Sequence, residues 1–163
     1  MRSLPSLSAS DWRRAGSVEV TSRFISELSA DPNNVRTHDP RNIEAIKASL
    51  KAFGQRKPIV VTAEGTVIAG NGTLEAAKQL GWDEIATVET PDGWTSDQLT
   101  AYAIADNRTA ELAGWDKPLL DATLEELALS GIDLADIGFE LDETTATESD
   151  MQPKLCPHCG AEI

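Results

Sequence analysis

Residues 66–78 read Thr-Val-Ile-Ala-Gly-Asn-Gly-Thr-Leu-Glu-Ala-Ala-Lys, and this stretch predicts a strand, a glycine-containing turn and a helix. The apolar residues at 67–69 are typical of a short buried strand. Gly70 and Gly72 permit backbone angles and close approaches that a side chain would forbid. We therefore expect this segment to lie at the centre of the fold.

The start of the predicted helix is a candidate anion site. Thr73 is suited to cap the helix, and Glu75 falls in its first turn. Free N–H groups at a helix start bind anions, most often phosphate. The same glycine pattern also occurs in ordinary hairpins and helix caps, so the stretch alone leaves a binding and a purely structural interpretation open.

Strands and helices are expected on both sides of this segment. Strands are expected within 18–28, in a hairpin over 58–69 and over 85–89; helices are expected over 40–53 and 73–80, from 95 through Leu112, and over 116–129. In the segment that follows, Ile137 and Phe139 are expected to fill the core. The pattern predicts an α/β (mixed α+β) fold, with a small mixed sheet, packed helices and a helical C-terminal part.

The totals limit the classes of function. The chain has 163 residues, 40% of them hydrophobic, and a formal net charge of −13. This charge argues against indiscriminate wrapping of nucleic acid. A local basic cluster, opposed only by Glu44, is either a solvated helix face or a phosphate-facing one; its members are Arg41, Lys47, Lys51, Arg56 and Lys57. Without a long apolar run or a signal peptide, we expect a cytoplasmic protein with no membrane partner.

Both ends of the chain differ in composition from its body. Residues 1–17 are expected to be a flexible extension, and residues 140–153 an acidic linker. Cys156 and Cys159 in the tail, residues 154–163, resemble one knuckle of a zinc ribbon. Because a closed zinc site needs four ligands, a zinc ion here would be shared between two chains. A vestigial knuckle or a pair of free thiols is the alternative.

Four segments, in this order, carry a family resemblance: Asp31-Pro-Asn-Asn-Val-Arg36, Phe53-Gly-Gln-x-x-Pro-Ile-Val-Val61, Ile68-Ala-Gly-Asn-Gly-Thr-Leu-Glu-Ala-Ala77 and Ala105-Asp-Asn-Arg108. Together they resemble the ParB N-terminal domain family, also called ParB-like nuclease domains, which shares a fold with sulfiredoxin. The resemblance covers about residues 18–115. Residues 116–139 look like the helical extension of ParB-like proteins from phages and mobile elements, some of which are fused to or encoded beside DNA methyltransferases.

The resemblance implies a nucleotide site. ParB-type partition proteins bind a cytidine nucleotide and hydrolyse it slowly, with the phosphates on the glycine turn and the following helix. The resemblance therefore implies CTP with Mg²⁺ as ligands of this chain. The matching positions are Arg36, Gln55, Gly70, Asn71, Gly72, Thr73, Asn107 and Arg108. Lys57 is a further cation expected nearby, together with Arg36 and Arg108.

Three departures from the family pattern affect function. Partition proteins carry Glu-Arg-Arg where this chain has residues 71–73, Asn-Gly-Thr, so two cations are missing from the phosphate turn. Weaker nucleotide affinity or another ligand is expected. Sulfiredoxin places its nucleophilic cysteine where this chain has Asn71, which excludes sulfiredoxin chemistry. No helix-turn-helix pattern follows residue 140, so full partition activity is not expected.

Three functions remain open. The first is a protein that binds a nucleotide or the phosphates of DNA. It would be accessory to DNA metabolism or modification in a phage or mobile element, and it could form a homodimer. The second is a Mg²⁺-dependent nuclease, nucleoside triphosphatase or phosphotransferase, with Glu75 and Asp106 as catalytic candidates and Asn107 and Glu111 as further metal ligands. The third is an adaptor with a degraded nucleotide site.

Overall fold

Five strands form one mixed sheet in the computed structural model, which describes residues 18–139. The elements in chain order are β1 (Val20–Phe24), the 3₁₀ turn η1 (Ile25–Glu27), β2 (Ser29–Ala30), α1 (Pro40–Phe53), β3 (Ile59–Val61), β4 (Thr66–Ala69), α2 (Asn71–Gln79), β5 (Glu84–Glu89), α3 (Ser96–Leu112), α4 (Lys117–Leu129) and the 3₁₀ turn η2 (Leu134–Ile137). The predicted mixed α/β fold is confirmed. No helix within residues 18–139 is long and apolar enough to span a membrane.

The strand order is β1-β5-β3-β4-β2, so β3 occupies the centre of the sheet. The hairpin partners β3 and β4 are antiparallel, as are β1 and β5. The pairs β3–β5 and β2–β4 are parallel. The predicted hairpin over 58–69 is therefore confirmed, and its two strands bring the glycine turn after β4 beside the start of β3.

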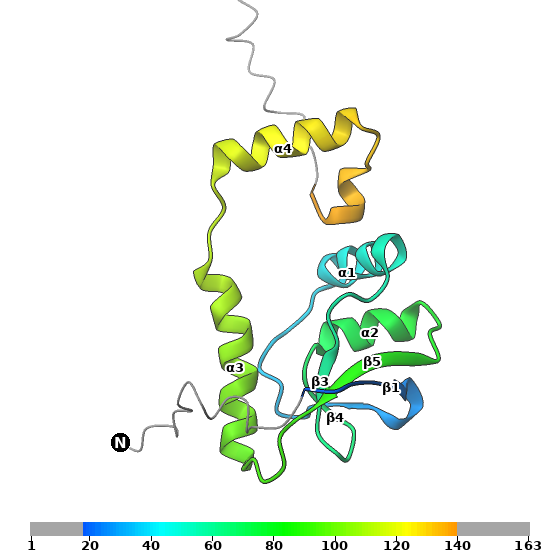
Figure 1. The fold of residues 1–163 in the computed structure, drawn as a ribbon, viewed down its shortest axis with the longest axis vertical. Helices are drawn as coiled ribbons and strands as arrows, with labels where there is room; N and C mark the ends of the chain where they lie inside the picture. The colour runs from blue at the N-terminus through cyan, green and yellow to red at the C-terminus, as the bar shows by residue number, and fades with distance from the viewer. Residues whose placement is uncertain (1–17, 140–163) are drawn as a thin grey trace, which may run out of the picture.

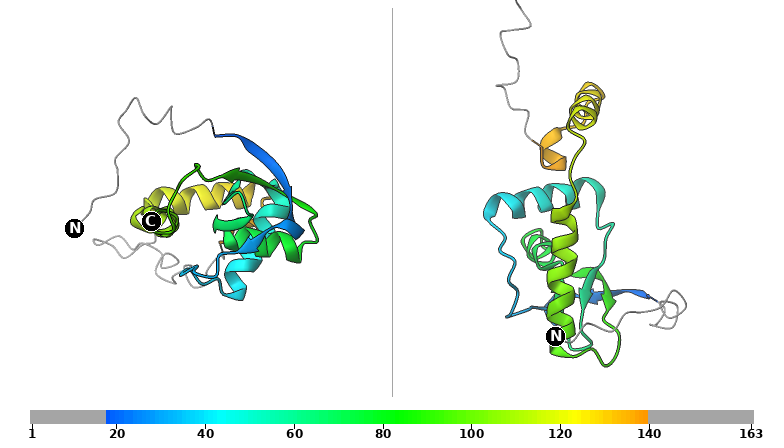
Figure 2. Two further views of the ribbon diagram at one scale, coloured as in Figure 1. Left: turned by 90° about the horizontal axis from the view of Figure 1, so that it is seen from below. Right: turned by 90° about the vertical axis from the view of Figure 1, so that its left-hand side faces the viewer.

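The core lies between the sheet and α2. Its centre contains Val61, Val67, Leu74 and Ile85, each no more than 2% exposed. Helix α1 packs on the other side of α2, so sheet, α2 and α1 form successive layers (Figure 1). Helix α3 stands beside these layers and contacts β4, as Figure 1 and the right-hand view of Figure 2 show.

Local signals account for most helix boundaries. Helix α1 has the predicted bounds 40–53, with Pro40 in its first turn and Gly54 at its end. The predicted cap of α2 is wrong, because α2 begins at Asn71 and not at Thr73. Gly70 occupies the cap position with φ 97°, and this left-handed residue turns the chain directly from β4 into the helix.

The buried residue of the C-terminal part differs from the two residues that were predicted to fill the core. Leu134, at 5% exposure, is the buried residue of η2, which contacts α1. Ile137 and Phe139 are only half-buried, so their predicted role as core residues is wrong. Leu112, expected on an apolar face of α3, is 69% exposed. Nothing from α3 or α4 is fully buried; α3 contacts β4, and α4 contacts η2.

Candidate functional site

A cavity of about 170 Å³ opens where the glycine turn, the loop before α1 and helix α3 meet. Its lining includes most of the residues that the sequence analysis singled out: Arg36, Lys57, Gly70, Asn71, Gly72, Thr73, Asp106 and Asn107. The loop before α1 adds Asn34 and His38, and the sheet contributes an apolar floor that includes Ile59 and Ile68. Of the basic cluster at residues 41–57, only Lys57 lines this cavity.

The two glycines of the turn allow the backbone itself to form a wall of the cavity. A Cβ atom on Gly70 would lie 2.5 Å from Ile59 Cγ2, and one on Gly72 would lie 2.8 Å from His38 Cε1. A side chain at either position would force its neighbour to shift, and Ile59, at 2% exposure, has little room to do so. The backbone N–H groups of residues 71–73 therefore begin α2 at the cavity surface, and the first N–H groups of a helix have no partner within it.

Two cations line the cavity, and α3 supplies a carboxylate to each of them. Arg36 Nη1 contacts Glu111 Oε1, and Lys57 Nζ lies 3.8 Å from Asp106 Oδ1. Arg108 Nη1 approaches the other oxygen of Glu111 at 3.2 Å. The hydrogen bonds from Arg108 and from Arg36 hold the pKa of Glu111 below its ordinary value, so this carboxylate stays charged at neutral pH.

His38 and Asn34 line the cavity but were not among the predicted site residues. Asn34 fixes the loop by donating to the Arg36 carbonyl at 3.0 Å and accepting from the Arg36 N–H at 3.1 Å. His38 Nδ1 is 2.7 Å from Asn42 Oδ1, which holds the ring against Gly72. The spacing 34, 36, 38 was an available signal, because alternate residues of an extended segment share one face.

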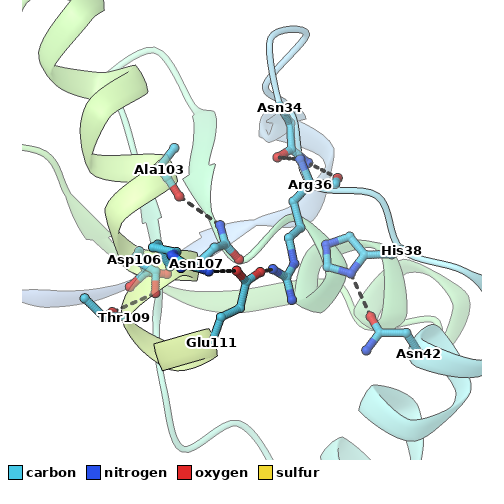
Figure 3. A network of polar contacts seen from close by, with 10 residues as sticks. Asn34, Arg36, His38, Asn42, Ala103, Asp106, Asn107, Thr109 and Glu111 are labelled. Atoms are coloured by element: carbon cyan, nitrogen blue, oxygen red, sulfur yellow. Dashed lines mark hydrogen bonds and ion pairs between the residues drawn. The ribbon is translucent and has the colours of Figure 1, made fainter. Parts of the chain in front are cut away.

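Asp106 and Asn107 are neighbours on α3, and both line the cavity. Asn107 Nδ2 donates to the Ala103 carbonyl at 2.8 Å, which leaves the amide oxygen available (Figure 3). One carboxylate and one amide oxygen suit Mg²⁺, which keeps several waters and takes its other ligands from substrate phosphates. Within residues 18–139 no group of three or more His, Cys, Asp or Glu side chains is arranged to hold a metal unaided.

Four candidate residues of the sequence analysis lie within the described part of the chain but do not line the cavity: Gln55, Glu75, Arg108 and Glu111. Glu75 lies on the exposed face of α2, where it accepts a hydrogen bond from Gln79 at 2.8 Å. Arg108 is 61% exposed and reaches the site only through Glu111. The predicted zinc ligands Cys156 and Cys159, the extension 1–17 and the linker 140–153 lie outside the described residues.

Gln55 has a structural contact instead. Its side chain accepts from the Ala86 N–H at 2.7 Å and donates to the Ala86 carbonyl at 2.9 Å. Strand β3 begins only at Ile59, after Pro58, which has no N–H to donate. The Gln55 amide therefore supplies the partner that the sheet lacks beside this part of β5.

Replacing Gln55 by alanine is expected to lower the free energy of unfolding by about 1–3 kcal/mol, because both backbone groups of Ala86 lose their partner. Urea denaturation measures this change. Gln79→Ala is the matched control, since the Gln79 amide is exposed and bonds only to Glu75. Equal stability losses in the two variants would contradict the structural role of Gln55.

Comparison with known proteins identifies the family. The family model described as the ParB N-terminal domain matches residues 11–108, more than half of the chain. A ParB-like nuclease domain-containing protein, YnaK of Escherichia coli, is 31% identical over 81 residues, which cover 50% of this chain and 92% of YnaK.

The fold is also that of a solved partition protein. The C-terminally truncated chromosome-partitioning protein ParB from Caulobacter crescentus, complexed with CTP-γ-S, matches with a TM-score of 0.61 and 18% identity, over 75% of this chain and 72% of that one. A pNOB8-like ParB N-domain matches with a TM-score of 0.45 and 20% identity, over 56% and 35% of the two chains. On the family model and the YnaK relationship, this chain belongs to the ParB N-terminal domain family.

Proposed function

We propose that the chain binds the phosphates of a nucleotide in this cavity, with CTP as the first candidate. The observation that carries the proposal is the convergence of the α2 N-terminus, Arg36 and Lys57 on one cavity. A helix start with close backbone approach is a general phosphate site, and Arg and Lys add charge-assisted bonds. The partition protein with the same fold is complexed with a CTP analogue, which supports CTP over other nucleotides.

The oxygen atoms of Asp106 and Asn107 in the cavity lining fit a Mg²⁺ ion. Asp106 and Asn107 would hold it through a carboxylate and an amide oxygen. When bound, the ion supplies charge neutralisation to the phosphates and fixes their orientation. In this proposal the backbone N–H groups at the start of α2 bind the phosphates, and Arg36 and Lys57 contribute positive charge.

Affinity is expected to be modest. The turn Asn71-Gly72-Thr73 contains no cation, and among the described residues only Arg36 and Lys57 supply cationic side chains to the lining. Both already have a carboxylate partner on α3. A phosphate must therefore compete for these cations and cannot use arginines of the turn itself.

Turnover of the bound ligand is a second candidate function, and Asp106 is the residue that favours it. Asp106 is the acidic side chain in the cavity lining, whereas Glu75 lies too far round α2 to take part. Slow hydrolysis of a nucleotide or cleavage of a DNA phosphodiester would use Asp106 and Asn107 with Mg²⁺. DNA, a DNA methyltransferase and a second copy of the chain remain proposed partners, and a phage or mobile element the proposed setting.

Separate calorimetric titrations with CTP, ATP, GTP and UTP, each with Mg²⁺, test the proposal. We expect saturable binding of CTP and, on amide hydrogen exchange, protection confined to residues 69–74 and to the part of α3 around Asp106 and Asn107, which line the cavity. Glu125→Gln on the exposed face of α4 is a control expected to bind normally. If none of the four nucleotides binds, the nucleotide proposal is wrong, and DNA or an adaptor role takes its place.

A further inference from the structure

The rim of the cavity contains a carboxylate that the proposed function does not use. Glu111, in the last turn of α3, is not part of the cavity lining, yet one of its oxygens contacts Arg36, which is. The other oxygen contacts Arg108, which is not. Figure 3 shows the Glu111 carboxylate directed toward the Arg36 guanidinium group. Glu111 thus joins a cation of the cavity to a cation outside it.

We propose that Glu111 is an internal anion that competes with a phosphate for Arg36 and thereby sets the affinity of the cavity. This inference rests on the proposed phosphate site and assigns to that site a residue that weakens ligand binding. A guanidinium binds phosphate best through two N–H groups at once. While Arg36 Nη1 is on Glu111, the ligand has fewer of these donors available.

The surroundings of Glu111 indicate that little free energy is needed for a phosphate to replace Glu111 on Arg36. The side chains of Arg36 and Glu111 are 41% and 42% exposed, and exposed ion pairs contribute little free energy. Glu111 also keeps a partner when it leaves Arg36, because Arg108 holds its other oxygen at 3.2 Å. Arg108 is therefore a positioning residue for Glu111.

The test replaces Glu111 by glutamine, which keeps the shape of the side chain and removes its charge. Titration with CTP and Mg²⁺ and with inorganic triphosphate is expected to show about two- to fivefold tighter binding than the unsubstituted chain. Cytidine, which has no phosphate, is expected to show no change. Glu125→Gln removes the same charge from a remote exposed position of α4 and is expected to leave all three affinities unchanged.

A double-mutant cycle with Arg36→Ala shows whether the effect passes through Arg36. The gain from Glu111→Gln is expected to vanish in the Arg36→Ala background. A gain that persists there, equal affinities of Glu111→Gln and the unsubstituted chain, or weaker binding by Glu111→Gln would each overturn the inference. In those three cases the phosphate site itself stands, provided that the unsubstituted chain binds CTP.

Two outcomes separate the inference from the proposed function. If only Glu111→Gln binds triphosphate, Glu111 competes so strongly that it suppresses the site, which supports the inference and contradicts CTP binding by the natural chain. If neither protein binds CTP or triphosphate, both the proposed function and the inference fail. Urea denaturation of Glu111→Gln confirms that the compared proteins are equally folded.

Discussion

Replacing Gly70 by alanine is expected to lower the free energy of unfolding by about 2–4 kcal/mol. About 1–2 kcal/mol of this comes from the strained backbone angle, and the rest from the close contact of the new Cβ atom with Ile59. Gly70 has φ 97°, where any other residue is strained. The new Cβ atom would also lie 2.5 Å from Ile59 Cγ2. Ile59 is 2% exposed and belongs to the central strand β3, so it has little freedom to move away.

A matched substitution separates the two causes. Gly81 also has a positive φ, 73°, but a Cβ atom there would meet nothing within 4 Å. Gly81→Ala is therefore expected to cost only the backbone part, about 1–2 kcal/mol. Urea denaturation of both variants measures the difference. If Gly70→Ala is no less stable than Gly81→Ala, the close packing of the glycine turn on β3 is not a requirement of this fold.

The bounds of α1 were predicted correctly from the sequence, whereas the start of α2 was not. Helix α1 was predicted with the correct bounds because Pro40 and Gly54 mark its ends locally. The start of α2 was predicted two residues late, at Thr73, because a good capping residue is a local signal. The residue that caps α2 is Gly70, which lies close against Ile59 of the neighbouring strand β3. This contact joins two separate elements, so the local sequence does not show it.

The site was predictable where its residues flank the glycine turn and less so on α3. The sequence of α3 has no strong apolar stripe, and none of its residues is fully buried. The sequence therefore does not show which side of the helix faces the cavity. Asp106 and Asn107 face it, whereas Arg108, one residue further, points out and reaches only Glu111. Gln55 was assigned to the ligand through the family resemblance, yet its amide is engaged with Ala86 in the sheet.

Arg36→Ala is expected to weaken binding of CTP with Mg²⁺ about ten- to hundredfold, the range for losing a hydrogen bond between charged groups. Arg36 lines the cavity, so a phosphate loses a direct cationic partner. The substitution also leaves the Glu111 carboxylate paired with Arg108, so the rim loses one positive charge. Both effects act against an anionic ligand, and calorimetric titration measures their sum.

Arg108→Ala is the control that separates direct contact from general charge, because it removes the same charge from the same carboxylate. Arg108 lies outside the cavity lining, so its loss is expected to weaken binding no more than about threefold, by leaving Glu111 to Arg36 alone. The loop is expected to keep its conformation in Arg36→Ala, because the Asn34 side chain bonds to the backbone of residue 36 and not to its side chain. Equal losses in the two variants would mean that the ligand responds to the overall field of the rim, and the cavity would then not be its binding site.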